Sequence, residues 1–479
     1  MRNCFLVLLA ICYPLLSGYA QNGSLDHFFD APGLKTSIWS IYAIDAKSGE
    51  RVASSEQKSL STASVMKLLT TAVSLDLLGP GFTFTTSLGY SGHLDHQTGL
   101  LTGNLILKGG GDPAFYSSFF EDHYKDCFEN WVSQMKKSGI KRITGNLMLD
   151  LSALDQPSIP GGWDWDDLGN YYGAGVSSLS YSDNLYDIHF SSPKTEGKAV
   201  AILSENPEIA DLHLENRVLS SSRAGDHTIV YGAHGSFQQL IEGTIPSNQS
   251  DFVVKAAMPD PALVAGQMFL KRLKQGGIQL FGGVFRLPAG FSETIFPLAS
   301  QLSPPLKELI VPLNKESLNL YAEHLLREIG RKRSGVPSVE KGIEAYRQFC
   351  IDKGLDVQGF FPEDGSGLSR SNALTAKTLV EILKYEYDGP LREAFFSSLP
   401  VAGVDGTLRN SFKGTPLEKN LKAKTGSMAR VRSIAGILKT RSGRNILLAI
   451  LINNFELTSS ESSKLLESIL LSFYNDSNR

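Results

Sequence analysis

Cysteine is scarce in this chain of 479 residues, which has four cysteines in all. Two of them, Cys4 and Cys12, fall within the first twenty residues. The other two, Cys127 and Cys350, lie far apart and form no C-x-x-C pair, so the sequence excludes a disulfide framework. We expect both to be buried thiols, because neither lies in a motif that would make it a nucleophile.

Motifs for metals and nucleotides are missing as well, and so is an excess of charge. The chain has no H-E-x-x-H pair, EF-hand loop, Walker loop or Rossmann glycine fingerprint, and we therefore expect no metal or nucleotide cofactor. Its formal net charge of -3 gives no electrostatic reason to expect a nucleic acid as a partner. A hydrophobic content of 42% and a charged content of 20% are typical of a globular protein, and the length predicts about two or three domains.

Long apolar runs are few, and the one that stands out lies at the start of the chain. Residues 1–20 carry Arg2, then an apolar stretch over residues 4–16, then small residues that end at Ala20. This pattern is typical of a cleaved secretory signal. We therefore expect an exported protein that works in the periplasm or at the cell envelope, with cleavage near Ala20.

Two other interpretations of this segment are disfavoured. An uncleaved membrane anchor needs ~20 unbroken apolar residues, and Pro14 interrupts a shorter run. A lipoprotein site at Cys12 would need a small residue before it, but Ile11 is large.

The pattern of the remaining chain changes twice. Residues 36–53 predict a β-hairpin, and an apolar helix is expected to open at Ser64 and to stop at Gly79. From about residue 82 to 291, short apolar segments alternate with turn residues, which predicts a β-rich insert. Helical spacing returns from about Pro297.

The C-terminal part predicts both helices and a sheet. We expect a helix over residues 375–387 and a hairpin of strands over 434–438 and 446–452. A capping box that begins at Thr458 predicts a last helix. One antiparallel sheet with helices around it, interrupted by the insert, is an α+β fold.

Two features of the insert have open interpretations. The T-G-N-L sequence of residues 102–105 recurs at 144–147, which favours paired hairpins rather than a solenoid. Aromatic and acidic residues gather at 163–167 and 171–175. They suit either a sugar-binding platform or a structural corner, and we favour the corner because aromatics beside glycine commonly pack domain junctions.

Three short motifs spread along the chain carry the chemistry. They are S-V-M-K at residues 64–67, S-L-N at 317–319 and K-T-G at 424–426, in that order. A serine hydroxyl is a poor nucleophile unless a neighbouring base accepts its proton. Lys67 lies one helical turn after Ser64 on the same face, and it can act as that base if burial and a second cation, Lys424, lower its pKa.

The second motif has two candidates. S-D-N at residues 182–184 matches the letters of a known motif, but it precedes a strand-like stretch inside the insert, where serine and asparagine are ordinary turn residues. S-L-N at 317–319 opens an amphipathic helix in the part of the chain that also carries K-T-G. We therefore favour Ser317 and Asn319.

The third motif suits an anionic ligand. Lys424 and Thr425 can bind a free carboxylate, and Gly426 lets the backbone approach a ligand closely. The N–H of Ser427 can join that of Ser64 to form an oxyanion hole. The ordered triplet is typical of β-lactamases and penicillin-binding proteins.

The sequence resembles a known family over nearly the whole chain that follows the signal. This family is the class C low-molecular-mass penicillin-binding proteins, the D-alanyl-D-alanine carboxypeptidase/endopeptidases of the penicillin-binding protein 4 type. The segments that carry the resemblance are residues 62–67, 109–113, 172–175, 317–319, 364–369, 402–408 and 423–427.

The resemblance implies a transpeptidase/β-lactamase-like domain with a helical subdomain, interrupted by a β-rich insert of two nested small domains. The implied units are a signal peptide, 1–20; the penicillin-binding catalytic domain, 21–85 and 293–479; insert domain II, 86–165 and 246–292; and nested insert domain III, 166–245.

The resemblance also implies residue roles. Ser64 is the acylated nucleophile, Lys67 its base, Ser317 the relay of a proton to the departing D-alanine, and Asn319 the group that holds the substrate amide. Lys424, together with Thr425, binds the terminal carboxylate of the substrate. The implied partners are peptidoglycan stem peptides and β-lactam inhibitors such as penicillin, with possible peripheral association with the cell envelope.

Other interpretations stay open on the sequence alone. A β-lactamase would use the same serine, but no motif here identifies a group that activates water for deacylation. A catalytically idle cell-wall-binding protein would lack some of the reactive residues, but all of them are present in this sequence. The G-S-G around Ser366 is expected to be a turn that lines the cleft, and Asp150, a possible contact for the third stem-peptide residue, more simply ends a strand.

Overall fold

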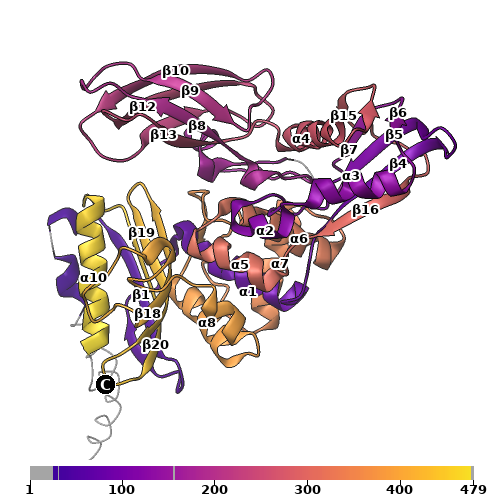
Figure 1. The fold of residues 1–479 in the computed structure, drawn as a ribbon. Coiled ribbons are helices and arrows are strands. Elements are labelled where there is room, and N and C mark those ends of the chain that lie inside the picture. Colours follow the sequence, from indigo (N-terminus) through magenta and orange to yellow (C-terminus); the bar gives the residue numbers. More distant parts are fainter. Residues whose placement is uncertain (1–24, 31, 155–156, 476–479) are drawn as a thin grey trace, which may run out of the picture.

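The protein is described here by a computed structural model that covers residues 25–30, 32–154 and 157–475. The expected secretory signal, residues 1–20, lies outside the described residues. The described chain forms an elongated molecule, with a five-stranded sheet at one end, helices in the middle and a seven-stranded sheet at the other end (Figure 1). Among these residues, no helix combines the length and the apolar character that a membrane span requires.

The five-stranded sheet joins the two ends of the chain. Its order is β18-β19-β20-β1-β2, with antiparallel neighbours throughout. The strands are β1 (Ile38–Asp45), β2 (Arg51–Ser54), β18 (Leu421–Met428), β19 (Val431–Lys439) and β20 (Asn445–Asn453). Both hairpins expected from the sequence, β1-β2 and β19-β20, are therefore confirmed.

Strand β20 is buried on both faces. Its alternate side chains point to opposite sides of the sheet, and each side is covered by helices. One set packs under helix α10 (Ser459–Asn475), and the other set packs toward the middle helices. The expected capping box starts α10: the N–H of Glu461 donates to Thr458 Oγ1 at 3.3 Å, and the N–H of Thr458 donates to Glu461 Oε2 at 2.8 Å.

Helix α1 lies at the centre of the helical cluster (Figure 1). It packs against α5, α6, α7 and α8, so every residue from its start to Leu75 is buried. The helices are α1 (Lys67–Leu78), α5 (Leu306–Lys315), α6 (Asn319–Ser334), α7 (Val339–Asp352), α8 (Ala376–Asp388) and α9 (Arg392–Ser397). Cys127 and Cys350 are free and buried, as the sequence predicted.

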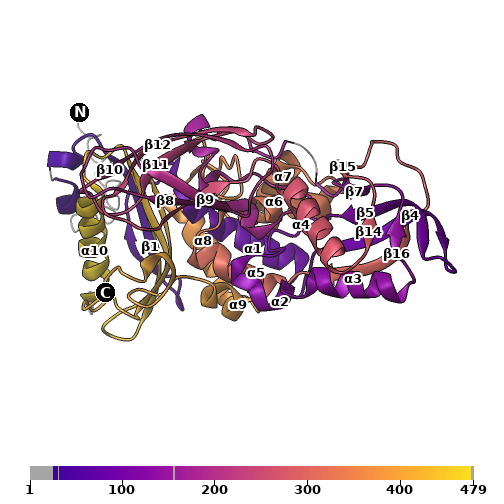
Figure 2. The same cartoon turned by 45° about the horizontal axis from the view of Figure 1, so that its top comes forward.

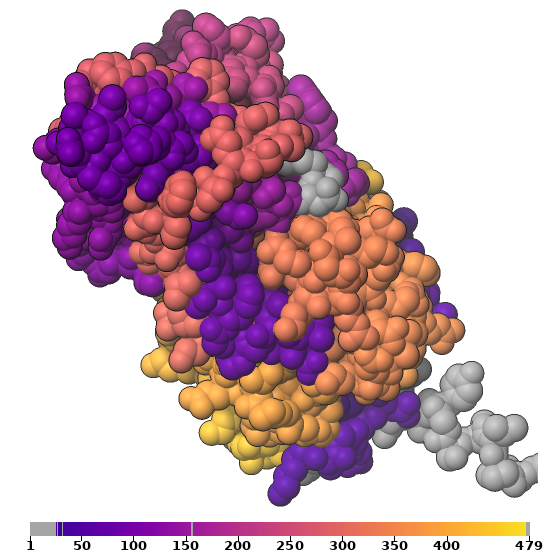
Figure 3. Space-filling model, turned by 90° about the vertical axis from the view of Figure 1, so that its right-hand side faces the viewer, coloured from indigo at the N-terminus to yellow at the C-terminus, as the bar shows by residue number. Residues whose placement is uncertain are grey.

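The seven-stranded sheet forms the far end of the insert. Its path is β14-β6-β5-β4-β16, with β7 between β5 and β15. The elements are β4 (Thr85–Asp95), β5 (Leu100–Lys108), β6 (Arg142–Ile143), β7 (Leu147–Asp150), β14 (Gln279–Leu280), β15 (Val284–Arg286), β16 (Phe296–Leu302), α2 (Glu121–Tyr124), α3 (Cys127–Lys137) and α4 (Pro261–Gln275). Figure 3 shows this end of the insert set apart from the C-terminal part of the chain.

The repeated T-G-N-L sequence has a different explanation from the one expected. Its two copies do not form paired hairpins, because β5 and β7 are parallel neighbours with Leu105 opposite Leu147. The side chain of Asn104 accepts a hydrogen bond from the N–H of Asn146 at 2.8 Å, so one copy binds the other. Helix α3 makes the crossover between them.

The second unit of the insert consists of two three-stranded sheets with orders β13-β8-β9 and β10-β12-β11, packed around a shared apolar core (Figure 2). The strands are β8 (Leu185–Ser191), β9 (Ala201–Asn206), β10 (His213–Ser221), β11 (His227–Tyr231), β12 (Gln238–Pro246) and β13 (Phe252–Ala257). The division into domains stays a prediction, but β13 lies beyond residue 245 and pairs with β8. Strand β16 likewise lies beyond residue 292 and pairs with β4 of the insert sheet.

Candidate active site

The three motifs meet at one cleft of about 490 Å³ between the five-stranded sheet, the helical cluster and the insert. Ser64, Ser317, Asn319, Thr425 and Ser427 all line it. They come from the turn before α1, the segment that enters α6, and strand β18. The fold therefore brings together residues that lie in three distant parts of the sequence.

Ser64 lies in a 3₁₀ turn, η4 (Ala63–Met66), rather than in the first turn of an α-helix. Helix α1 begins only at Lys67, so the expected helix starts later than the sequence indicated. Lys67 Nζ nevertheless donates to Ser64 Oγ at 3.0 Å, as the three-residue spacing predicted. Ala63, directly before the serine, has a φ of 45°, a left-handed value that is unusual outside glycine.

Lys67 is completely buried and points into a polar site. Its Nζ also donates to Asn319 Oδ1 and to the backbone carbonyl of Ser366, both at 2.6 Å. Burial lowers the pKa of Lys67 to about 7, against the opposing charges of Asp364 and Glu323. Close to neutral pH, part of the lysine population is therefore uncharged and able to accept a proton.

Asn319 is held from both sides at the first position of α6. Its Oδ1 accepts from Lys67, and its Nδ2 donates to the backbone carbonyl of Tyr172 at 2.8 Å. Tyr172 belongs to η7 (Tyr171–Gly173) of the insert. The insert thus contacts the site directly and fixes the orientation of this amide.

Lys424 connects the second and third motifs. Its Nζ donates to Ser317 Oγ and to the carbonyl of Thr425, both at 2.9 Å. Burial, followed by the charge of Lys67, lowers the pKa of Lys424 well below its ordinary value. The hydroxyl of Thr425 shares a hydrogen bond of 2.9 Å with that of Thr407, from η9 (Gly406–Leu408).

Gly426 is needed for packing as well as for access to a ligand. A Cβ atom on it would lie 2.2 Å from Ser433 Oγ and 2.7 Å from the carbonyl of Thr62. The glycine therefore lets η4, which carries Ser64, lie directly on β18. Ser433 Oγ donates to that same Thr62 carbonyl at 2.6 Å and closes the contact.

We expect Gly426→Ala to lower the free energy of unfolding by about 1–3 kcal/mol, because η4 and β18 must separate to admit the methyl group. Denaturant unfolding measures this change. The control is Gly81→Ala, since nothing lies within 4 Å of the Cβ position there. Equal stability of the two variants would contradict the close packing of η4 on β18.

One wall of the cleft carries charged and aromatic groups from the insert. Asp167, Tyr171 and Tyr172 line it together with Arg370. The structural corner favoured for this aromatic cluster is therefore an incomplete interpretation, because the cluster also forms part of the cleft. Asp150 instead pairs with Lys108 at 3.4 Å in the insert sheet.

The S-D-N segment of the insert has a different place. It forms η8 (Ser182–Asn184), and Asp183 accepts a hydrogen bond from the hydroxyl of Tyr321 at 3.1 Å. Among the described residues that line the cleft, none comes from this segment. The S-L-N segment, by contrast, contributes Ser317 and Asn319 to the lining.

Sequence reasoning missed the groups that hold Lys67 and Asn319 in place. The carbonyls of Ser366 and Tyr172 carry no sequence signal, because every residue has a carbonyl. Glu323 had a weak signal: it follows Asn319 by four positions and so lies on the same face of α6. The loop around Ser366 was expected to line the cleft, and Gly367 does so. Within the described ranges, no group of three or more His, Cys, Asp or Glu side chains is placed to hold a metal.

A serine hydroxyl bonded to a buried lysine, beside a second serine–lysine pair, is the arrangement expected of an active-site serine enzyme. The chain belongs to the D-Ala-D-Ala carboxypeptidase 3 (S13) family, whose family model matches residues 21–471. The family and the peptidase class expected from the sequence are thereby confirmed.

Two relatives illustrate the match. The chain is 28% identical over 446 residues to a D-alanyl-D-alanine carboxypeptidase of Actinomadura sp. (strain R39), which covers 90% of this chain and 80% of that protein. It is 28% identical over 397 residues to the D-alanyl-D-alanine carboxypeptidase DacB of Haemophilus influenzae, which covers 82% of this chain and 80% of that protein.

A solved structure shares the fold. The crystal structure of penicillin binding protein 4 (dacB) from Haemophilus influenzae superposes with a TM-score of 0.80 at 24% sequence identity. The match covers 94% of this chain and 99% of that chain, so it includes the insert. The α+β, transpeptidase/β-lactamase-like fold class is confirmed.

Proposed function

We propose that this D-Ala-D-Ala carboxypeptidase hydrolyses the D-alanyl-D-alanine bond of peptidoglycan stem peptides through an acyl-enzyme on Ser64. One observation carries the proposal: Ser64, with its lysine partner, faces the same cleft as the Ser317–Lys424 pair. A bond that follows D-alanine also occurs in peptidoglycan cross-links, so endopeptidase activity belongs to the same proposal.

In the first step Ser64 Oγ attacks the carbonyl of the penultimate D-alanine and Lys67 Nζ accepts the hydroxyl proton. The hydrogen bond of 3.0 Å between the two atoms supports this proton transfer. The N–H groups of Ser64 and Ser427 stabilise the oxyanion. Asn319 holds Lys67 in position and presents its amide to the substrate backbone.

In the second step the peptide bond breaks and the terminal D-alanine leaves. Its amine takes a proton from the hydroxyl of Ser317, and Ser317 regains one from Lys424, which donates to its Oγ at 2.9 Å. The proton that Lys67 accepted from Ser64 replaces the one that Lys424 gave, so the two lysines together return to their starting charge. Thr425 and Lys424 bind the terminal carboxylate, the anion for which a hydroxyl and a buried cation are suited. Water then hydrolyses the ester on Ser64, which yields the shortened peptide and free serine.

β-Lactams are proposed to acylate the same hydroxyl. The Haemophilus influenzae penicillin binding protein 4 has also been solved as a complex with a β-lactam. In this chain a β-lactam carboxylate would take the Thr425 and Lys424 position, while the strained amide faces Ser64. Met428 and Ala429 lie along the cleft beyond this position and would contact the inhibitor's side chain.

Analysis of the reaction products tests the function. The protein is incubated with a monomeric pentapeptide muropeptide and with a cross-linked dimer, each with and without penicillin, and the products are identified by mass spectrometry. We expect loss of one D-alanine from the pentapeptide, cleavage of the dimer, and inhibition of both by penicillin. Unchanged substrates would contradict the proposal, and rapid turnover of a chromogenic cephalosporin would instead favour a β-lactamase.

We expect the acylation rate to rise with pH through an acid limb near pH 7. Lys67 acts only in its uncharged form, and its pKa is lowered to about 7, so protonation below that pH removes the base. The measurement is the second-order rate of penicillin labelling between about pH 5 and 9. A rate that stays flat across this range would show that no group with such a pKa serves as the base.

Export and domain organisation belong to the same proposal. A peptidoglycan hydrolase must reach the cell wall, so we propose a periplasmic or envelope-associated protein whose mature chain starts near Gln21. N-terminal sequencing of the exported protein tests this start. We propose residues 21–85 and 293–479 as the catalytic domain, 86–165 and 246–292 as insert domain II, and 166–245 as nested insert domain III, with β13 and β16 crossing these boundaries to complete the sheets of domains III and II.

A further inference from the structure

Two buried carboxylates fix the loop that contacts Lys67. Glu323 Oε1 accepts hydrogen bonds from the consecutive N–H groups of Gly365 and Ser366, at 3.0 and 2.9 Å. Asp364 accepts from the N–H groups of Gly367 and Ser369, both at 2.7 Å. Both carboxylates have no exposed surface, so water does not compete for these bonds.

The loop held in this way carries the carbonyl that binds the lysine. The N–H of Ser366 donates to Glu323, while the carbonyl of the same residue accepts from Lys67 Nζ at 2.6 Å. The loop also lies tightly on the turn that bears Ser64. Gly367 has a φ of 84°, and a Cβ atom on it would lie 2.0 Å from the carbonyl of Ala63. A shift of the loop would therefore move the Ser366 carbonyl that accepts the hydrogen bond of Lys67.

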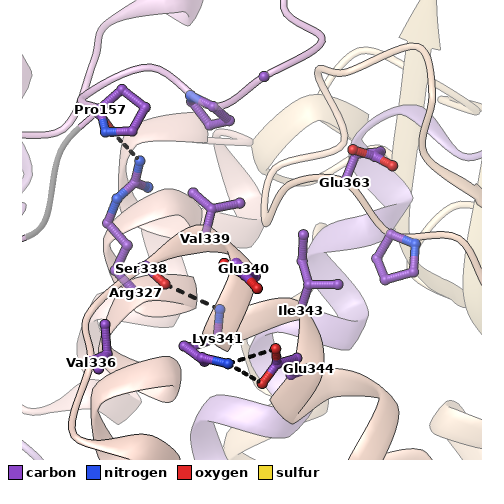
Figure 4. Close-up of a pocket in the computed structure, with 13 residues that line it drawn as sticks. Pro157, Arg327, Val336, Ser338, Val339, Glu340, Lys341, Ile343, Glu344 and Glu363 are labelled. Atoms are coloured by element: carbon purple, nitrogen blue, oxygen red, sulfur yellow. Dashed lines mark hydrogen bonds and ion pairs between the residues drawn. The ribbon is translucent and has the colours of Figure 1, made fainter.

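Arg327 forms an ion pair with Glu323. Its guanidinium lies 3.5 Å from Glu323 Oε2 and is only 1% exposed. It also donates to the carbonyl of Pro157 at 2.9 Å, and it lines a second pocket of about 640 Å³ (Figure 4). The arginine therefore links Glu323 to the insert. A continuous series of polar contacts runs from this pocket through Arg327, Glu323 and the loop of Ser366 to Lys67.

The charged groups around Lys67 come from three elements. Glu323 belongs to α6, Asp364 to the loop before β17 (Ala373–Leu374), and Lys424 to β18. The two carboxylates favour the charged lysine, and burial opposes them. Burial raises the pKa of Glu323 itself to about 7, against the charge of Arg327.

We propose that Glu323, supported by Arg327, is a positioning residue: it fixes the amides of Gly365 and Ser366 so that the Ser366 carbonyl aims Lys67 at Ser64, and its buried negative charge acts on the amine of that lysine. This inference rests on the proposed role of Lys67 as the base for Ser64. It assigns a function to a carboxylate that lies outside all three motifs.

The test uses Glu323→Gln in the full chain, with the rate of Ser64 acylation by labelled penicillin measured as a function of pH. Glutamine keeps a carbonyl oxygen for the two amides but removes the negative charge. We expect the acid limb to move to lower pH by about half a unit or more, because the charged lysine loses a stabilising partner. A purely structural role would lower the rate equally at every pH and leave the limb in place.

A second variant separates the anchor from the charge. Glu323→Ala removes both, so we expect the same shift of the limb together with a maximal acylation rate that is lower by roughly 10- to 100-fold, because the loop no longer holds the lysine. Rates for Glu323→Ala that match those of Glu323→Gln at every pH would show that the hydrogen bonds to the loop do not position the lysine.

The matched control is Glu328→Gln, on the same helix. Glu328 is also a buried carboxylate, paired with Arg331 at 3.0 Å, and burial raises its pKa as well. We expect an unchanged acid limb for this variant. Equal limbs for Glu323→Gln, Glu328→Gln and the parent protein would overturn the inference, while acylation of Ser64 in the parent would still support the proposed function.

A double variant keeps the test decisive if Glu323→Gln fails to fold. Exchange of Glu323 and Arg327 together for glutamine leaves no unpaired buried charge. Of these two groups, Glu323 is the one that acts on the charge of Lys67, so a downward shift is again expected. An unmoved limb in a folded double variant would overturn the inference. Absence of Ser64 acylation in the parent protein would overturn the proposed function and this inference with it.

Discussion

Ser64→Ala is expected to abolish both penicillin labelling and D-alanine release while the protein stays folded. Removal of the nucleophile from a serine hydrolase costs about 10⁴-fold or more in rate, since the substrate then has no hydroxyl to acylate. The half-buried side chain at this position loses only a hydroxyl, and the packing of η4 on β18 is unchanged. Gel labelling with fluorescent penicillin, release of free D-alanine and circular dichroism measure the three properties.

The control for this variant is Ser74→Ala. Ser74 lies on α1, buried, with its hydroxyl bonded to the carbonyl of Thr70 at 2.7 Å inside its own helix. We expect this variant to be labelled at the parent rate. Residual D-alanine release by Ser64→Ala above the background rate would mean that another group is the nucleophile.

Lys67→Met is expected to slow acylation by roughly 10²- to 10⁴-fold, the usual contribution of a general base. Methionine fills similar space but cannot accept the proton of Ser64, so the acid limb near pH 7 should disappear along with the rate. Stopped-flow or quenched labelling over a pH series measures both effects. Because the hydroxyl of Ser64 remains, slow labelling at that residue should persist at high pH.

The control for the lysine is Lys422→Met. Lys422 lies on β18 two residues before Lys424, but its side chain is exposed. Parent activity is expected for it. If Lys67→Met kept the parent rate and the same acid limb, the base would have to be sought elsewhere, and Lys424 would be the first candidate.

The local parts of the site were predictable from the sequence. Ser64 and Lys67 lie three residues apart on an apolar segment, and that spacing alone predicted their contact. The distant partners Ser317 and Lys424 required the ordered triplet and the family resemblance, because nothing local indicates which serine a buried lysine will bind. The structure places Ser64 and Ser317 in the lining of one cleft, and each accepts a hydrogen bond from a buried lysine.

The groups that hold Lys67 and Asn319 in place could not be predicted in the same way. A carbonyl such as that of Ser366 acts through the path of the backbone, and the sequence does not specify that path. Glu323 resembles an ordinary helix-surface glutamate, and only the tertiary packing of α6 buries it. Tyr172 belonged to an aromatic cluster that suited a domain corner, and its role in the cleft depends on where the insert docks.

The fold shows the same division between local and distant information. Apolar runs joined by turn residues predicted the β1-β2 and β19-β20 hairpins, and the capping box that begins at Thr458 predicted helix α10. The repeated T-G-N-L segments were misinterpreted because a repeat indicates similar strands but does not tell whether they pair in parallel or antiparallel fashion. Here the crossover helix α3 makes them parallel.

The most direct test of the central claim is to locate the β-lactam adduct on the chain. The protein is incubated with penicillin, digested, and the modified peptide is sequenced by tandem mass spectrometry. We predict one adduct, on the peptide that contains Ser64 and at that residue. An adduct at Ser317 or Ser366 with Ser64 unmodified, or a protein that carries no adduct at all, would contradict the account.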